Sequence, residues 1–189
     1  MNATGSGLLI GLLVFATPVF GEDTSQAMLA FGLSGAWSVD CSTDMSQPCV
    51  DIDRCFPRLI FTIPLQGSPI QQVMSPTAVA GQVFGSAVTV NSATRIGDDR
   101  IRITTTAAVS LSGPASSTQQ TLGETWETVY RKQGTNLRVW SARETGGTKI
   151  GARDGYRWEP ASDWKPENGG VPRWRQTDQE TPSLAKCAN

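Results

Sequence analysis

The sequence of 189 residues contains no histidine, and its formal net charge is only −1. Without histidine the chain lacks the usual general base near neutral pH, which excludes Ser–His–Asp and Cys–His catalysis. The sequence also lacks a glycine-rich phosphate loop, an EF-hand loop and any histidine-based metal motif. A net charge near zero gives no electrostatic reason to expect a nucleic-acid partner. We therefore expect a protein that is not an enzyme, needs no cofactor and does not bind nucleic acid.

Long hydrophobic stretches are also scarce. The apolar run from Leu8 to Phe20 is shorter than the ~20 residues that a membrane-spanning helix needs. We interpret residues 1–21 as a secretory signal peptide that is cleaved after Gly21. No Lys or Arg precedes the run, so an uncleaved anchor is the alternative. The mature chain is predicted to be periplasmic or secreted, with no transmembrane segment.

Four cysteines, an even number in a chain expected to be exported, predict two disulfides. Three pairings are possible, and we expect Cys41–Cys187 and Cys49–Cys55. The first would join the first strand to the C-terminal tail, and the second would close a short loop. The cysteine spacings are not those of a zinc site, and histidine is absent, so we expect no metal.

Alternating apolar and polar residues predict several short strands. Ile101 and Ile103 face one side while Arg100 and Arg102 face the other, and Trp126, Thr128 and Tyr130 share a face. Turn signals every eight to twelve residues favour an all-β sandwich or barrel. We expect a short helical turn or disorder over the polar lead 22–31, a single domain over 32–189, a strand break at Gly85, and an irregular tail from Glu159 to Asn189.

The first predicted strand, residues 32–41, contains Gly35-Ala36-Trp37 and ends in Cys41, and the chain ends in a Cys187 segment. This arrangement resembles that of uncharacterised secreted bacterial proteins with a lipocalin-like fold. The resemblance implies a small antiparallel β-barrel of about eight strands, with Trp37 at the closed end. By the two-residue period of a strand, Val39 is expected on the same face as Trp37. The resemblance also implies that the barrel mouth takes a small apolar or amphipathic ligand. We expect the protein to be a monomer. By alternation, the interior-facing candidates for that ligand site are Ile101, Ile103, Trp126, Thr128 and Tyr130.

Two further functions are open. Periplasmic inhibitors of secreted metalloproteases are similar in having a small barrel with a Gly-x-Trp strand, and they block the protease with their N-terminal lead, here 22–31. A structural role that binds a cell-envelope polymer is the other alternative, because arginines and tryptophans interleave in the C-terminal third. Its candidate surface residues are Arg157, Trp158, Trp164, Arg173 and Trp174. The explanation that we favour for these tryptophans is that they anchor an irregular tail to the barrel while the arginines stay solvated.

Carboxylates are the remaining chemical possibility. Glu124 and Glu127 flank Trp126, but residues three apart on a strand face opposite sides, which disfavours an acid pair. The acids near the first loop are expected to be solvated or to form a weak calcium site; they are Asp40, Asp44, Asp51 and Asp53.

Overall fold

The computed structural model describes residues 23–49, 55–77, 83–110, 123–162 and 172–188. The predicted signal peptide, residues 1–21, lies outside these ranges. One helix, α1 (Thr24–Phe31), precedes the strands. The strands in chain order are β1 (Gly35–Ser38), β2 (Arg58–Thr62), β3 (Ile70–Pro76), β4 (Val83–Ile96), β5 (Arg100–Ser110), β6 (Thr125–Gln133), β7 (Asn136–Glu144), β8 (Ile150–Arg153), β9 (Tyr156–Pro160), β10 (Trp174–Glu180) and β11 (Ser183–Lys186).

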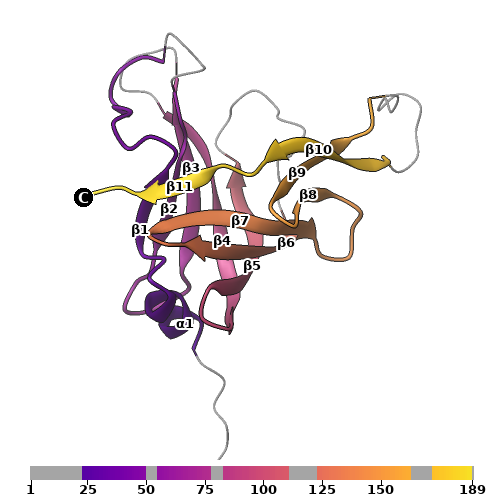
Figure 1. The fold of residues 1–189 in the computed structure, drawn as a ribbon. Coiled ribbons are helices and arrows are strands. Elements are labelled where there is room, and N and C mark those ends of the chain that lie inside the picture. Colours follow the sequence, from indigo (N-terminus) through magenta and orange to yellow (C-terminus); the bar gives the residue numbers. More distant parts are fainter. Residues whose placement is uncertain (1–22, 50–54, 78–82, 111–122, 163–171, 189) are drawn as a thin grey trace, which may run out of the picture.

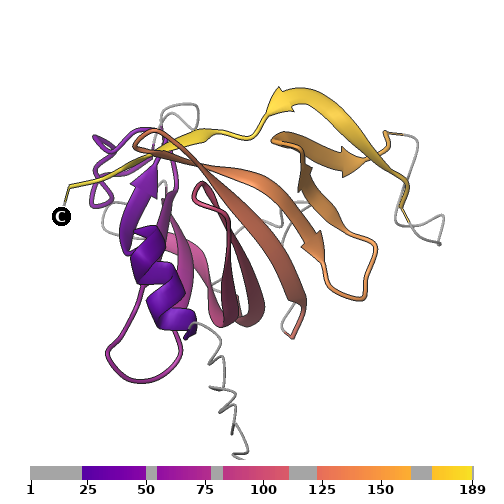
Figure 2. The same cartoon turned by 60° about the horizontal axis from the view of Figure 1, so that its bottom comes forward.

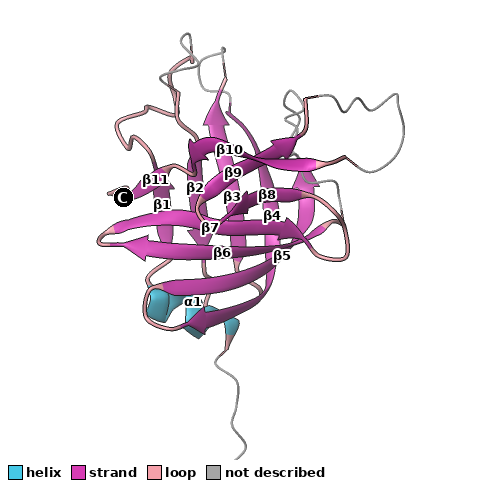
Figure 3. Ribbon diagram, turned by 45° about the vertical axis from the view of Figure 1, so that its right-hand side comes forward, coloured by secondary structure: helices cyan, strands magenta, loops and turns pink. Residues whose placement is uncertain are grey.

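Eight of these strands form a closed antiparallel barrel (Figures 1 and 3). The ring runs from β1 through β2, β3, β4, β5, β6 and β7 to β11, which pairs again with β1. The predicted all-β barrel of about eight strands is therefore confirmed.

The inward-facing residues follow the predicted alternation. Ile101 and Ile103 are completely buried, whereas Arg102 between them is exposed. On β6, Trp126, Thr128 and Tyr130 are all buried, as their shared face requires. The Tyr130 ring meets Phe61 edge to face, with ring centroids 5.5 Å apart, inside the barrel core.

Helix α1 lies across one end of the barrel, at the bottom of Figure 1, and Figure 2 shows it from below. Its residues Ala27, Met28 and Phe31 are buried in the barrel core, and Gly32 ends the helix in the left-handed conformation. Trp37 is buried in the same cluster, and its indole N–H donates to the carbonyl of Leu33 at 2.9 Å. The lead predicted as a helical turn or disorder is thus a helix that closes the barrel.

Strand β7 pairs with two different strands along the same edge. Near its start Leu137 and Arg138 pair with β11, and near its end Ala142 and Arg143 pair with β8. From that point β8, β9 and β10 continue as a sheet extension that stands away from the barrel, at the right of Figure 1. The extension and the barrel are therefore one continuous sheet that forks at β7.

In its described part, the predicted irregular tail is instead largely strand. Strand β10 lies at the outer edge of the extension, and β11 completes the barrel. Most side chains of β10 are exposed and polar, and β11 has only four residues, none completely buried. Neither strand therefore has the apolar alternation that makes a strand recognisable from sequence.

Two smaller expectations were wrong. Gly85 does not break a strand, because β4 runs through it; a Cβ atom there would lie 2.0 Å from the carbonyl oxygen of Val73, so the glycine lets β3 and β4 approach. Val39 does not share the buried face of Trp37, because β1 ends at Ser38 and Val39 is exposed.

Both predicted disulfides are confirmed. Cys41–Cys187 joins the segment after β1 to the segment after β11, and Cys49–Cys55 closes a loop. Within the part of the chain that the structure describes, no helix is both long and apolar enough to cross a bilayer.

Candidate functional site

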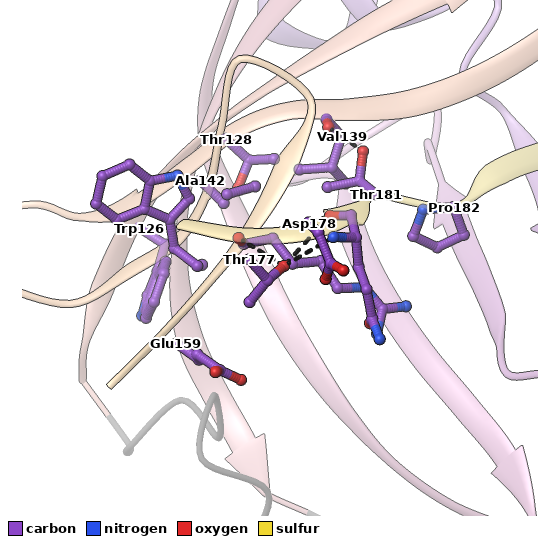
Figure 4. A pocket seen from close by; sticks show the side chains of 14 residues that line it. Trp126, Thr128, Val139, Ala142, Glu159, Thr177, Asp178, Thr181 and Pro182 are labelled. Atoms are coloured by element: carbon purple, nitrogen blue, oxygen red, sulfur yellow. Dashed lines mark hydrogen bonds between the residues drawn. The ribbon is translucent and has the colours of Figure 1, made fainter. Parts of the chain in front are cut away.

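A cavity of about 570 Å³ lies between the barrel wall and the sheet extension. It is lined by β6 and β7 on the barrel side and by β8, β9 and β10 on the extension side (Figure 4). The core cluster beside α1 includes Tyr130 of β6 and Leu137 of β7, whereas the cavity lies farther along both strands, at Trp126 and Ala142. The cavity is therefore at the end of the barrel interior that α1 does not close.

The barrel side of the cavity is mostly apolar. Its residues point inward from β6 and β7 and are Trp126, Thr128, Val139 and Ala142. The Trp126 indole N–H donates to the carboxylate of Glu124 at 3.2 Å, and Glu124 forms an ion pair with the ammonium group of Lys149. These contacts hold the indole ring in one orientation at the cavity wall.

Small residues on β8 leave room for the cavity. Ala152 pairs with Ala142, and the next ladder pair joins Ile150 to Arg143, so Gly151 is an extra residue that bulges from β8. A Cβ atom at Gly151 would lie 3.6 Å from the Trp126 ring, which is an ordinary contact distance. A methyl group would therefore fit at this position in ordinary contact with Ala142 and Trp126, so glycine is not a steric necessity there.

The extension side of the cavity is polar. Arg157, Trp158 and Glu159 line it from β9, and Thr177, Asp178 and Gln179 line it from β10. Strand β10 is irregular here, because its pairing with β9 shifts between Gln176 and Glu180. This bulge turns Thr177 and Asp178 toward the middle of the lining residues in Figure 4, between Trp126 and Pro182.

The fork between β11 and β8 is stabilised by Thr181, which also lines the cavity. Its hydroxyl donates to the carbonyl of Val139 at 2.6 Å and lies 3.2 Å from the carbonyl oxygen of Gly155. The Gly155 N–H donates to the Trp140 carbonyl at 2.8 Å, and the Thr181 N–H donates to the Gly155 carbonyl at 2.7 Å. Backbone groups of β7 that have no strand partner at the fork are satisfied in this way.

The predicted ligand-binding residues all face the barrel interior, but they separate into two groups. Ile101, Ile103 and Tyr130 belong to the packed core and are at most 2% exposed. Trp126 and Thr128 line the cavity. Burial raises the pKa of the Tyr130 hydroxyl, which donates to the side-chain carbonyl of Gln71 at 3.1 Å.

The predicted surface-binding residues do not form one exposed platform. Trp158 and Trp174 are half-buried, and their indole nitrogens are buried with no hydrogen-bond partner among the described residues. Arg153 lies over the Trp158 ring, 5.8 Å from its centroid. Arg157 and Trp158 line the cavity, Arg173 is exposed at the start of the β10 region, and Trp164 lies outside the described residues.

The carboxylates considered from the sequence are engaged separately. Glu127 forms ion pairs with Arg102 and Arg143 on the outside of the barrel, away from Glu124. Hydrogen bonds from Ser42 and Ser46 hold the pKa values of Asp40 and Asp44, respectively, below their usual range. Asp51 and Asp53 lie outside the described residues, and no group of metal-binding side chains occurs within them.

Several cavity residues were not predicted. The polar ones lie on β9 and in the β10 bulge, in the tail expected to be irregular, and are Glu159, Thr177, Asp178 and Gln179. The others are Val139, Ala142, Gly151, Ala152, Thr181 and Pro182. The two consecutive small residues Gly151 and Ala152 were the only feature of the sequence that could have indicated a cavity. A bulge in an edge strand leaves no periodic pattern in the sequence.

Comparison with known proteins found no protein-family model, no curated protein and no solved structure that matches this chain.

Proposed function

We propose that this protein is exported and binds one small amphipathic molecule in the cavity between its barrel and its sheet extension, without acting on it chemically. The observation that carries the proposal is the cavity itself. Its volume of about 570 Å³ falls within the roughly 300–1,000 Å³ of small-molecule sites. An apolar barrel wall facing a polar extension suits a molecule with one apolar and one polar part.

Two features support export and the absence of chemistry. Both disulfides fit an oxidising compartment outside the cytoplasm. All four cysteines are in disulfides and the chain has no histidine, so neither a thiol nucleophile nor an imidazole base is available to the cavity. The alternative roles are less well supported, because α1 is part of the core and Trp158 and Trp174 are half-buried.

The first experiment is native mass spectrometry of the mature protein, purified without detergent, followed by titration with N-phenyl-1-naphthylamine as the probe. We expect saturable one-to-one binding. Ala142→Leu places three additional carbons in the cavity and is expected to weaken binding roughly tenfold, the equivalent of about 1.4 kcal/mol.

Ala30→Leu is the matched control, because Ala30 is exposed on α1 at the opposite end of the barrel. It should bind the probe as the unmodified protein does, and circular dichroism should show both variants folded. Non-saturable binding, or equal affinity for the two leucine variants, would contradict the proposed site.

A further inference from the structure

An arginine on β9 and an aspartate on β10, Arg157 and Asp178, both line the cavity. Trp158 of β9 pairs with Gln176 of β10, and Tyr156 pairs with Glu180, so Arg157 lies opposite the bulge that contains Asp178. The bulge is fixed by Thr177, whose hydroxyl donates to the Arg157 carbonyl at 3.1 Å and accepts the Gln179 N–H at 3.2 Å. These contacts fix the backbone of the two strands from which Arg157 and Asp178 extend at the cavity.

Neither charge is neutralised within the described part of the chain. The one hydrogen bond of the Arg157 guanidinium goes to the neutral side-chain carbonyl of Gln179, at 3.5 Å. Asp178 forms no ion pair with the described residues, although Arg157 is on the neighbouring strand. Glu159, the third charged residue of the lining, differs because Arg175 binds it at 2.7 Å. The cavity therefore presents one uncompensated cation and one uncompensated anion.

Apolar surface adjoins these charges. Trp126 and Ala142 form the barrel wall of the same cavity, and Ala152 lies beside Ala142 on the adjacent strand β8. A ligand that fills the cavity would place an apolar part against this wall and a polar part against the β9–β10 pair. A head group with a single charge would satisfy one of Arg157 and Asp178 and repel the other.

We propose that the ligand is a zwitterionic amphiphile, whose acidic group binds Arg157, whose ammonium group lies at Asp178 and whose apolar chain packs on Trp126 and Ala142. This inference rests on the proposed function, because it assigns the chemical class of the ligand to the same cavity. The aromatic rings of the lining add a favourable surface for an ammonium group.

The test uses three molecules with a twelve-carbon chain, each below its micelle-forming concentration: N-dodecyl-N,N-dimethylglycine (zwitterion), dodecyltrimethylammonium (cation) and dodecanoate (anion). Trimethylglycine supplies the zwitterionic group without the chain. By isothermal titration calorimetry we expect the zwitterion to bind about two- to fivefold more tightly than either singly charged compound, the range of a solvent-accessible ion pair. Trimethylglycine alone should bind far more weakly.

Two variants assign each charge. Arg157→Gln should remove the advantage of the zwitterion over the cation, and Asp178→Asn should remove its advantage over the anion. Arg95→Gln, at the exposed end of β4, and Asp98→Asn, on the turn that follows it, make the same charge changes and should not alter binding.

The outcomes separate the two proposals. If no twelve-carbon compound binds, the proposed function fails. If all three bind equally and the variants have no effect, the cavity binds amphiphiles but the zwitterion inference fails. Tightest binding of dodecanoate or of dodecyltrimethylammonium, or equal binding of trimethylglycine without its chain, would also overturn the inference.

Discussion

Two glycines, Gly85 in β4 and Gly151 in β8, have opposite steric surroundings although neither needs a left-handed backbone. A Cβ atom at Gly85 would overlap the Val73 backbone, which cannot move without separating β3 from β4. We expect Gly85→Ala to lower the free energy of unfolding by about 1–3 kcal/mol, as other overpacked positions do.

Gly151→Ala is the matched control for this prediction, because its Cβ would make only ordinary contacts. It should be neutral or stabilise by up to about 1 kcal/mol through the reduced entropy of the unfolded chain. Urea unfolding of both variants measures the difference, and a Gly85→Ala protein as stable as Gly151→Ala would show that β3 and β4 have room to separate.

Thr181 carries the second prediction at the scale of single residues. Thr181→Val keeps the shape of the side chain but leaves the Val139 carbonyl without its hydroxyl donor at a buried position. We expect a loss of about 1–3 kcal/mol, the cost of an unsatisfied buried polar group. Thr181→Ser retains the hydroxyl and should recover most of the stability in thermal unfolding; equal losses would instead implicate packing.

Individual inward-facing residues were predictable where a strand has one buried and one exposed face. Ile101, Ile103, Trp126 and Tyr130 follow this pattern, and the structure buries all of them. Thr177 and Asp178 were not predictable, because they line the cavity through a bulge whose position depends on the pairing of β9 with β10. The position of a bulge depends on how the strand pairs with its neighbour, so the sequence of β10 alone does not reveal it.

At the scale of elements, the fork at β7 creates the cavity, because it directs β8, β9 and β10 away from the barrel. Nothing in the sequence of β7 indicates its division between β11 and β8. The division depends on Thr181 and Gly155, which supply hydrogen bonds at the middle of β7. Such tertiary hydrogen bonds have no local periodicity.

The two disulfides connect elements over very different lengths of chain, with separations of 146 residues for Cys41–Cys187 and 6 residues for Cys49–Cys55. In the chain-entropy model, replacing the long-range pair by serines should cost about 4–5 kcal/mol, and replacing the short-range pair about 2–3 kcal/mol. Denaturant unfolding of the two double-serine variants tests this order, which the reverse ranking would contradict.

At the scale of the whole molecule, the composition predicts an unusual dependence of stability on pH. The chain has no histidine and all its cysteines are in disulfides, so no side chain that ordinarily titrates between about pH 6 and pH 9 remains. The free energy of unfolding should therefore be nearly constant across this interval.

Above about pH 10 the stability should fall. Burial raises the pKa of Tyr130 in the folded protein, so this hydroxyl keeps its proton after the unfolded chain has lost it. The native state then binds more protons than the unfolded state, and stability decreases as pH rises, by up to about 1.4 kcal/mol per pH unit for one group.

Urea unfolding between pH 6 and pH 11 measures both parts of this profile. Tyr130→Phe should reduce the decrease in the free energy of unfolding above about pH 10. Losing the hydrogen bond to Gln71 lowers the stability of this variant at every pH. Tyr156→Phe, at the half-buried start of β9, is the control, and its stability should decrease above about pH 10 as that of the unmodified protein does. If the free energy of unfolding of Tyr130→Phe decreases above about pH 10 as it does in the unmodified protein, groups other than Tyr130 cause the decrease.

The position of β11 in the ring also has a consequence for the time course of folding. Synthesis runs from the N-terminus, so residues 183–186 are made after the other seven barrel strands. Until they arrive, β1 and the beginning of β7 each present an edge without a partner, and such edges invite pairing with other chains. The nascent protein is thus an open curved sheet, and its last strand converts a species prone to self-association into a closed one. Because this step joins segments so far apart in the chain, we expect it to be slow, on the order of milliseconds to seconds.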